Sequence, residues 1–94
     1  MDDLSAAVAR DFGAKLRKAR QASGLSQEAL ADLSGMTRTA ISPLERGDHM
    51  PRLDTVIKLA GALGKEPCEL IADYRWHPPT RGPAAGRFRP SDDR

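Results

Sequence analysis

The chain has 94 residues, enough for one modest hydrophobic core but not for a catalytic domain beside a ligand-sensing one. The formal net charge is only +2, but the charges are segregated: −2 over residues 1–11, +3 over 12–52, −2 over 53–73 and +3 over 74–94. Either basic segment can face an anionic partner, although a solvated mixed surface explains the same pattern. The single cysteine excludes an internal disulfide. With no recognisable secretory signal or apolar stretch of about 20 residues, we expect a cytoplasmic protein without a membrane span.

The first two helices are predicted from apolar residues at helical spacing and from the glycines that follow them. The first ends at Gly24, which can adopt the left-handed conformation that closes a helix. Ser26 is expected to cap a second, short helix that stops at Gly35. The apolar faces of the two helices consist of Leu4, Val8, Phe12, Leu16 and Ala19, and of Leu30, Ala31 and Leu33.

The next three helices follow the same logic. Thr37 is expected to cap a third helix that ends at Gly47, with Met36 pointing into the core. A fourth helix is predicted before Gly64, and a short fifth begins at Pro67, where the missing amide costs nothing. The expected apolar positions are Leu53, Val56, Ile57, Ala60 and Leu63, followed by Leu70 and Ile71.

The remaining residues form an expected tail. Four prolines and two glycines after residue 76 argue against further helix, and we expect the globular part to end near Ala72. Tyr74 and Trp76 alternate as on one face of a strand, and residues 86–89, with Phe88, suit a second extended segment. A hairpin of these segments would lean on the fifth helix or on a partner's tail. A disordered basic tail that adds phosphate contacts is the alternative.

The predicted fold is therefore all-α: a five-helix domain over residues 1–73 with an extended C-terminal tail over 74–94, for which a β-hairpin is one arrangement. Within it, residues 24–47 form two short helices joined by a glycine-containing turn of a few residues. Helices joined in this way cross steeply, so the second stands proud of the domain. Such an exposed helix fits the major groove of DNA, with its first residues projecting toward the bases.

Residues 12–71 resemble the DNA-binding domain of lambdoid phage repressors and Xre-like regulators. The resemblance rests on the LSQEALA run, the turn glycine Gly35, the run from Ile41 to Gly47, Pro51, and the LAGALG run ending at Gly64. It implies a five-helix domain that contains a helix-turn-helix. Such a domain would bind duplex DNA sequence-specifically as a dimeric transcriptional regulator that acts as a repressor. The recognition helix would span about residues 37–46, and no cofactor or enzymatic activity is implied.

The resemblance also assigns roles to individual residues. Base reading would fall to Arg38, Thr39 and Pro43: a guanidinium can donate two parallel hydrogen bonds to guanine, and threonine can offer its hydroxyl or place its methyl on thymine. Gln27 would contact the DNA backbone beside a helix N-terminus, although a solvated glutamine is the plainer explanation. The other expected backbone contacts are Ser26, Ser42, Arg46 and Arg52.

Arg20 and Glu45 resemble a family ion pair that ties the first helix to the recognition helix. We expect this pair to be half buried and to position the recognition helix more than it stabilises the fold, because desolvation offsets much of the attraction. Exposure of both side chains is the alternative.

The sequence departs from the family pattern at two positions. Pro43 lies inside the recognition helix, which we expect to bend, tighten or shorten after about one turn; its ring can still pack on a thymine methyl. Asp48 stands where a basic residue is typical and would repel a phosphate. Arg52 is a poor capping residue at the start of the fourth helix, which hints at a DNA contact there.

Other kinds of function have little support in the sequence. His49, His77 and Cys68 are too scattered for a metal site or a catalytic group, and Cys68 is expected to pack inertly. We expect dimerisation through Tyr74, Trp76 and Phe88, since lambdoid-like domains pair on palindromic operators. Two alternatives stay open: an antitoxin-type repressor that holds a toxin through its tail, and a protein-interaction domain in which Pro43 and Asp48 mark lost DNA affinity.

Overall fold

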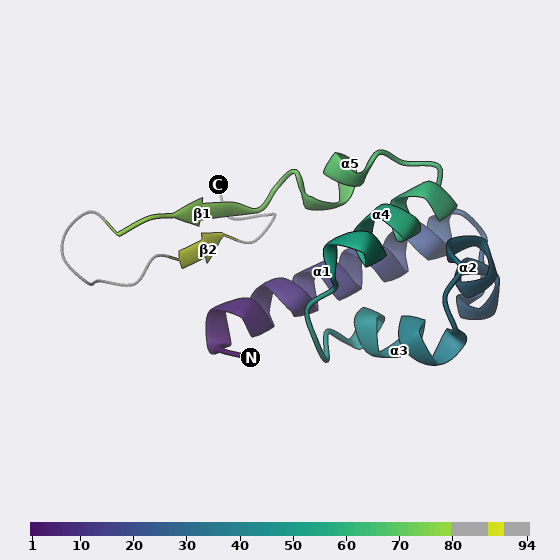
Figure 1. The fold of residues 1–94 in the computed structure, drawn as a ribbon, viewed down its shortest axis with the longest axis horizontal. Helices are drawn as coiled ribbons and strands as arrows, with labels where there is room; N and C mark the ends of the chain where they lie inside the picture. The colour runs from purple at the N-terminus through teal and green to yellow at the C-terminus, as the bar shows by residue number, and fades with distance from the viewer. Residues whose placement is uncertain (80–86, 90–94) are drawn as a thin grey trace.

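Five helices surround one core, and two short strands extend from it in a computed structural model that describes residues 1–79 and 87–89 (Figure 1). The arrangement confirms the all-α fold with five helices and a hairpin tail. The elements are α1 (Asp3–Ala22), α2 (Gln27–Ser34), α3 (Arg38–Arg46), α4 (Leu53–Ala62), α5 (Pro67–Ile71), β1 (Arg75–His77) and β2 (Arg87–Arg89). Within the described ranges, none of the helices is long and apolar enough to cross a membrane.

Local chemistry sets most of the helix ends. Ser26 caps α2 as predicted, because its Oγ accepts a hydrogen bond from the Ala29 amide at 3.0 Å. Gly35 ends α2 with a φ of 70°, a left-handed conformation that glycine adopts without strain. The predicted side-chain cap at Thr37 is wrong: Thr37 Oγ1 lies 2.9 Å from Thr39 Oγ1, and no cap bond forms.

Residues from all five helices form the core. The apolar periodicity predicted burial correctly at most of these positions. The prediction is wrong for five residues that are exposed, because each helix buries only a narrow face: Leu4, Leu33, Leu53, Ile57 and Ile71. Their exposed fractions range from 41% for Ile71 to 73% for Leu53. Cys68 is also exposed, so its expected packing role is wrong. The buried cluster consists of Phe12, Leu16, Leu30, Ala31, Ile41, Leu44, Val56, Leu59, Ala60 and Leu70.

Helices α1 and α3 approach each other closely at Gly13, which lies against the C-terminal end of α3. A Cβ at Gly13 would lie 2.4 Å from the carbonyl oxygen of Leu44 and 2.6 Å from that of Glu45. Both atoms belong to backbone, which cannot swing aside as a long side chain can. Glycine at this position therefore fixes the spacing between α1 and α3.

Tyr74 packs into its own chain just before β1. Its ring lies against the core, and its hydroxyl donates a hydrogen bond to Asp11 Oδ2 at 2.7 Å. Lys15 Nζ lies 4.7 Å from the ring centroid and 3.4 Å from Asp73 Oδ2. Burial, together with the hydrogen bond to Asp11, raises the pKa of Tyr74 above its usual range. The packed part of the chain thus extends beyond the expected end near Ala72.

The two strands form an antiparallel pair in which Trp76 is the register partner of Phe88. β2 lies alongside α1, as Figure 1 also shows. β2 therefore packs on α1 and not on the fifth helix, whereas contact with a partner's tail stays a prediction. Sequence periodicity within the tail could not reveal this contact, because it carries no information about distant segments.

Candidate nucleic-acid interface

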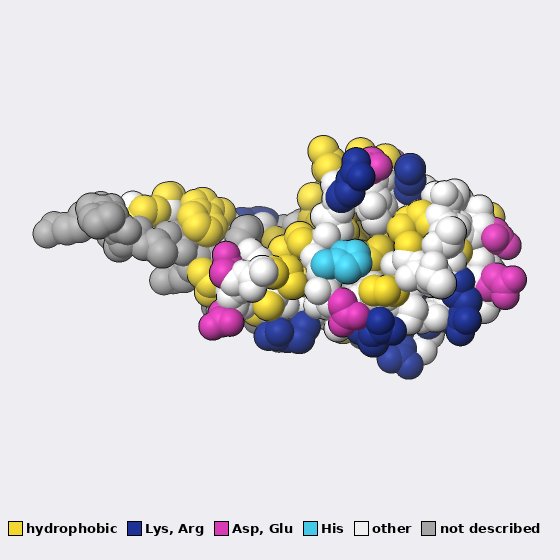
Figure 2. Space-filling view, turned by 60° about the horizontal axis from the view of Figure 1, so that its bottom comes forward, with side chains coloured by type: hydrophobic (Ala, Val, Ile, Leu, Met, Phe, Trp, Pro, Cys, Tyr) yellow, Lys and Arg dark blue, Asp and Glu magenta, His cyan; other side chains and the backbone are white. Residues whose placement is uncertain are grey.

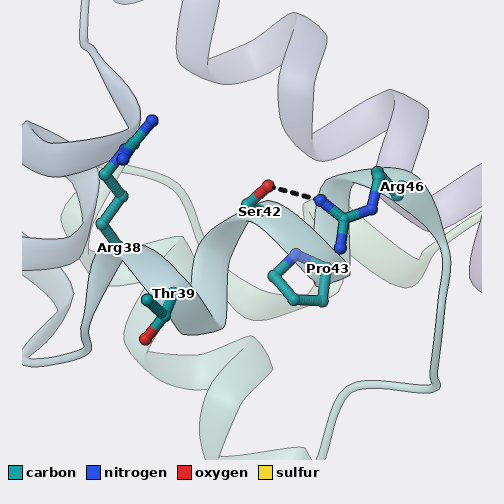
Figure 3. Close-up of a pocket in the computed structure, with 5 residues that line it drawn as sticks. All are labelled: Arg38, Thr39, Ser42, Pro43 and Arg46. Atoms are coloured by element: carbon teal, nitrogen blue, oxygen red, sulfur yellow. Dashed lines mark hydrogen bonds between the residues drawn. The ribbon is translucent and has the colours of Figure 1, made fainter.

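Helix α3 presents one face to the core and the opposite face to solvent. On its inner face, α3 buries Ile41, Leu44 and Glu45. The outward side chains line a shallow cavity of about 280 Å³ (Figure 3), and these are Arg38, Thr39, Ser42, Pro43 and Arg46. The structure thus brings together all three residues expected to read bases and two of the five expected at the DNA backbone.

Pro43 does not interrupt α3. The helix runs from Arg38 to Arg46, so the expected shortening after one turn is wrong. Its first turn is tight, because the Ala40 amide donates to the Thr37 carbonyl at 3.0 Å, three residues back. The Pro43 carbonyl still accepts a hydrogen bond from the Asp48 amide, at 3.0 Å. The proline ring is therefore held on a continuous helix.

Arg46 is oriented by two neighbours. Its Nη1 donates to Ser42 Oγ at 2.7 Å (Figure 3), and its Nε and Nη2 donate to Asp48 Oδ2 at 3.1 and 2.9 Å. The sequence suggested that Asp48 would repel a phosphate. In the structure its carboxylate is paired with Arg46, which offsets that charge locally, a role that sequence reasoning missed. The only sign of this pairing in the sequence was that Asp48 follows Arg46 by two residues, on the other side of Gly47.

Arg38 differs from Arg46 in making no polar contact with the residues that the structure describes. Within the part of the chain that the structure describes, its guanidinium makes no hydrogen bond or ion pair. In Figure 3 it extends from the first turn of α3, away from the other four labelled residues. A guanidinium that is exposed and unengaged keeps all five of its N–H donors for a ligand.

Beneath this face lies an ion pair between Arg20 of α1 and Glu45 of α3. Arg20 Nε donates to Glu45 Oε2 at 2.6 Å and Nη2 to Oε1 at 3.1 Å, a bidentate geometry. The side chains are only 11% and 3% exposed, so the pair is buried more deeply than expected. The hydrogen bonds that Arg20 donates to the Glu45 carboxylate raise the pKa of Arg20. Arg20 Nη1 also donates to the Leu25 carbonyl at 2.8 Å, which connects α1 to the start of the two-helix unit.

The remaining expected backbone contacts surround α3. Gln27 Nε2 donates to Glu45 Oε1 at 3.1 Å, which fixes the amide and leaves its second N–H for another acceptor. Ser26 caps α2 beside it. Arg52 precedes α4 without a side-chain cap bond, and its Nε lies 3.3 Å from Asp54 Oδ1. Figure 2, with this side turned forward, shows Lys and Arg side chains above and below a band of mostly uncharged atoms.

The part of the chain that the structure describes offers no candidate metal site. No group of three or more His, Cys, Asp or Glu side chains is placed so that it could hold an ion there.

The short α2, followed by α3 with arginine and hydroxyl groups on its outward side, is the arrangement of a DNA-binding helix-turn-helix unit. The chain belongs to the helix-turn-helix family, whose sequence profile matches residues 16–70. Control protein C.BamHI of Bacillus amyloliquefaciens is 43% identical over 61 residues, which are 64% of this chain and 75% of that protein. The prophage-derived regulator YonR of Bacillus subtilis is 42% identical over 53 residues, 56% of this chain and 49% of that protein. These relatives are regulators and not enzymes.

Solved structures show the same fold. The restriction-modification controller protein C.AhdI from Aeromonas hydrophila superposes with a TM-score of 0.66 and 48% identity, over 68% of this chain and 97% of that chain. The P22 c2 repressor, solved in complex with a synthetic operator, gives a TM-score of 0.58 and 30% identity, over 63% and 89% of the two chains.

Proposed function

We propose that this regulator represses transcription in the cytoplasm by binding a palindromic operator as a homodimer, with α3 in the major groove. The observation that carries the proposal is the outward face of α3, to which Thr39, Pro43 and Arg38, with its unengaged guanidinium, all contribute. The similarity to the P22 c2 repressor, solved with a synthetic operator, supports duplex DNA as the ligand. The proposal includes no catalytic step and no cofactor.

Backbone contacts would come from residues that flank this face. Arg46 and Arg52 supply cations, and Gln27, Ser26 and Ser42 supply polar groups. Ser42 Oγ accepts a hydrogen bond from Arg46 and therefore keeps its own hydrogen for a phosphate oxygen. The Asp48 carboxylate holds Arg46 against the end of α3, which reduces the freedom that the arginine loses on binding.

The dimer contact proposed for the tail now depends on Trp76 and Phe88. Trp76 is 52% exposed, although it pairs in register with Phe88 on β2. Tyr74 is committed to the core and to Asp11 of its own chain, so it would support the hairpin and not the partner.

The base-reading role of Arg38 is tested by selecting bound duplexes from a random library and then measuring Arg38→Ala. We expect this variant to lose about 1 to 3 kcal/mol on the selected duplex and little on scrambled DNA, because a bidentate contact to guanine is sequence-specific. Lys18→Ala is the matched control, since Lys18 lies with Lys65 and Glu69 beside α5, away from α3. Equal weakening of both duplexes by Arg38→Ala would make Arg38 a phosphate contact instead.

A further inference from the structure

We propose that a cavity between α1 and α5 binds a small aliphatic dicarboxylate, and that this ligand regulates the binding of the operator. The cavity has a volume of about 250 Å³, and its walls come from α1, from α5 and from the residues that flank α5. Pockets for drug-sized ligands measure roughly 300 to 1,000 Å³, so this cavity suits a smaller molecule. The ligand site is independent of the proposed function, whereas its effect on operator binding rests on that function.

The first argument is the balance of charge on the cavity wall. Lys15 Nζ lies 3.4 Å from Asp73 Oδ2, so these two charges are paired. The Glu69 carboxylate accepts a hydrogen bond from a backbone amide at the start of α5, at 2.7 Å. Lys18 and Lys65 also line the cavity, and they make no ion pair or hydrogen bond with the residues that the structure describes. Two ammonium groups are therefore available for an anionic ligand.

The second argument is the origin of these two ammonium groups. Lys18 belongs to α1, whereas Lys65 lies just before α5, so each comes from a different wall of the cavity. A ligand with one carboxylate for each lysine would bridge the two walls. Each carboxylate could then accept charge-assisted hydrogen bonds from its lysine, which are stronger than those between neutral groups.

The third argument is the apolar surface between the charges. Ala19, Ala22 and Leu70 contribute to the same cavity, and Leu70 belongs to the buried core cluster. The methylene groups of an organic ligand would cover this surface and remove it from water, which favours binding. Inorganic phosphate carries charge but no apolar group. The site should therefore prefer a dicarboxylate with a short aliphatic chain.

The regulatory effect follows from the position of the cavity at the base of the hairpin. α5 packs on α1, and Asp73, which lines the cavity, directly precedes the tyrosine that binds Asp11 of α1. A ligand that bridges Lys18 and Lys65 would hold α5 against α1 and so stabilise the hairpin base. Because the hairpin is the proposed dimer contact, the ligand should favour the dimer and raise operator affinity.

The first test measures ligand binding without DNA. The full chain is titrated with glutarate at constant ionic strength, and backbone amide signals are followed by NMR. We expect saturable shifts around Lys18 and Lys65 with a Kd of about 1 mM, because two partly exposed ion pairs bind weakly. Lys18→Ala and Lys65→Ala should each weaken binding up to about five-fold. Lys58→Ala is the matched control and should leave the Kd unchanged, since Lys58 lies on α4 next to Asp54 and outside the cavity.

Two further probes test the chemistry of the ligand. Butyrate is glutarate without its second carboxylate, and inorganic phosphate lacks the aliphatic chain. Each should bind about five-fold more weakly than glutarate. Equal affinity for all three anions, or glutarate binding that persists unchanged in the double variant Lys18→Ala/Lys65→Ala, would overturn the dicarboxylate site.

The second test adds glutarate to the measurement of operator binding. At constant ionic strength, about 10 mM glutarate should raise the affinity of the native chain for the selected operator about five-fold. An equal rise in the double variant, or saturable glutarate binding without any change in operator affinity, would overturn the regulatory role. Glutarate binding in a chain for which no duplex is enriched would overturn the proposed function and support the ligand site, so the two failures are distinguishable.

Discussion

Glu45 connects three helices of the domain through its buried carboxylate. It accepts hydrogen bonds from Arg20 and Gln27, residues of α1 and α2, while its own backbone belongs to α3. The burial of the pair means that its net contribution to stability is small, because desolvation offsets the attraction. Its main effect is positional: it sets the recognition helix relative to the glutamine expected at the DNA backbone.

At this scale we predict that Glu45→Ala destabilises the fold by about 3 to 5 kcal/mol, because Arg20 would remain buried without a counter-charge. The double variant Arg20→Met/Glu45→Leu should recover most of this loss, since it leaves no unpaired charge. Urea unfolding of the three proteins measures both effects. A loss below about 1 kcal/mol for Glu45→Ala would mean that Arg20 reaches water when its partner is removed.

At the scale of elements, the position of α3 depends on how closely α1 can approach it. Gly13 allows backbone contact at the C-terminal end of α3, and the Arg20–Glu45 pair lies along the same crossing. Two contacts of different chemistry, one steric and one ionic, thus hold the recognition helix against α1.

We predict that Gly13→Ala destabilises the domain and weakens operator binding, because its Cβ would overlap the Leu44 carbonyl oxygen. Alanine favours a helix over glycine by about 1 kcal/mol, which a backbone clash of this size outweighs. Gly61→Ala in α4 is the matched control: its Cβ would meet no atom within 4 Å, so the same exchange should stabilise the fold. Thermal unfolding compares the two. Equal stabilisation by both would show that α1 and α3 can separate without cost.

Local signals in the sequence predicted the helices well, because caps and glycines act within a few residues. Ser26, Gly35 and Gly47 confirm this, as each ends or begins a helix where expected. The buried contact of Gly13 and the pairing of Asp48 with Arg46 were missed, since both depend on where other groups lie in space. The ion pair of Arg20 was inferred through family resemblance, and the periodicity of α1 could not have supplied it.

At the scale of the whole molecule, the tail determines how two copies could meet. Tyr74 anchors the base of the hairpin to α1 through Asp11, and β2 lies along the same helix. The hairpin is therefore held in a defined place on the domain and presents Trp76 near its base. A second surface competes for the same role: an apolar groove of about 260 Å³ that includes Met50, Leu53 and Ile71.

We predict that a chain truncated after Tyr74 is monomeric at micromolar concentration, whereas the full chain is dimeric. Truncation at this point keeps the tyrosine in the core and removes only the hairpin. Sedimentation measures the change, and Trp76→Ala in the full chain should weaken the dimer in the same direction. A truncated chain that is still dimeric would place the interface elsewhere, with the groove around Leu53 as the next surface to mutate.

The central claim, specific binding of duplex DNA by the α3 face of a dimer, is tested most directly by salt titration of binding to the selected operator. The phosphate contacts proposed for Arg46 and Arg52 amount to four neutralised phosphates in the proposed dimer, which predicts a slope of log K against log salt of about −3.6. The double variant Arg46→Ala/Arg52→Ala should flatten this slope, while the operator still binds more tightly than scrambled DNA. A slope near zero for the native chain, or equal affinity for the operator and scrambled DNA, would contradict the account.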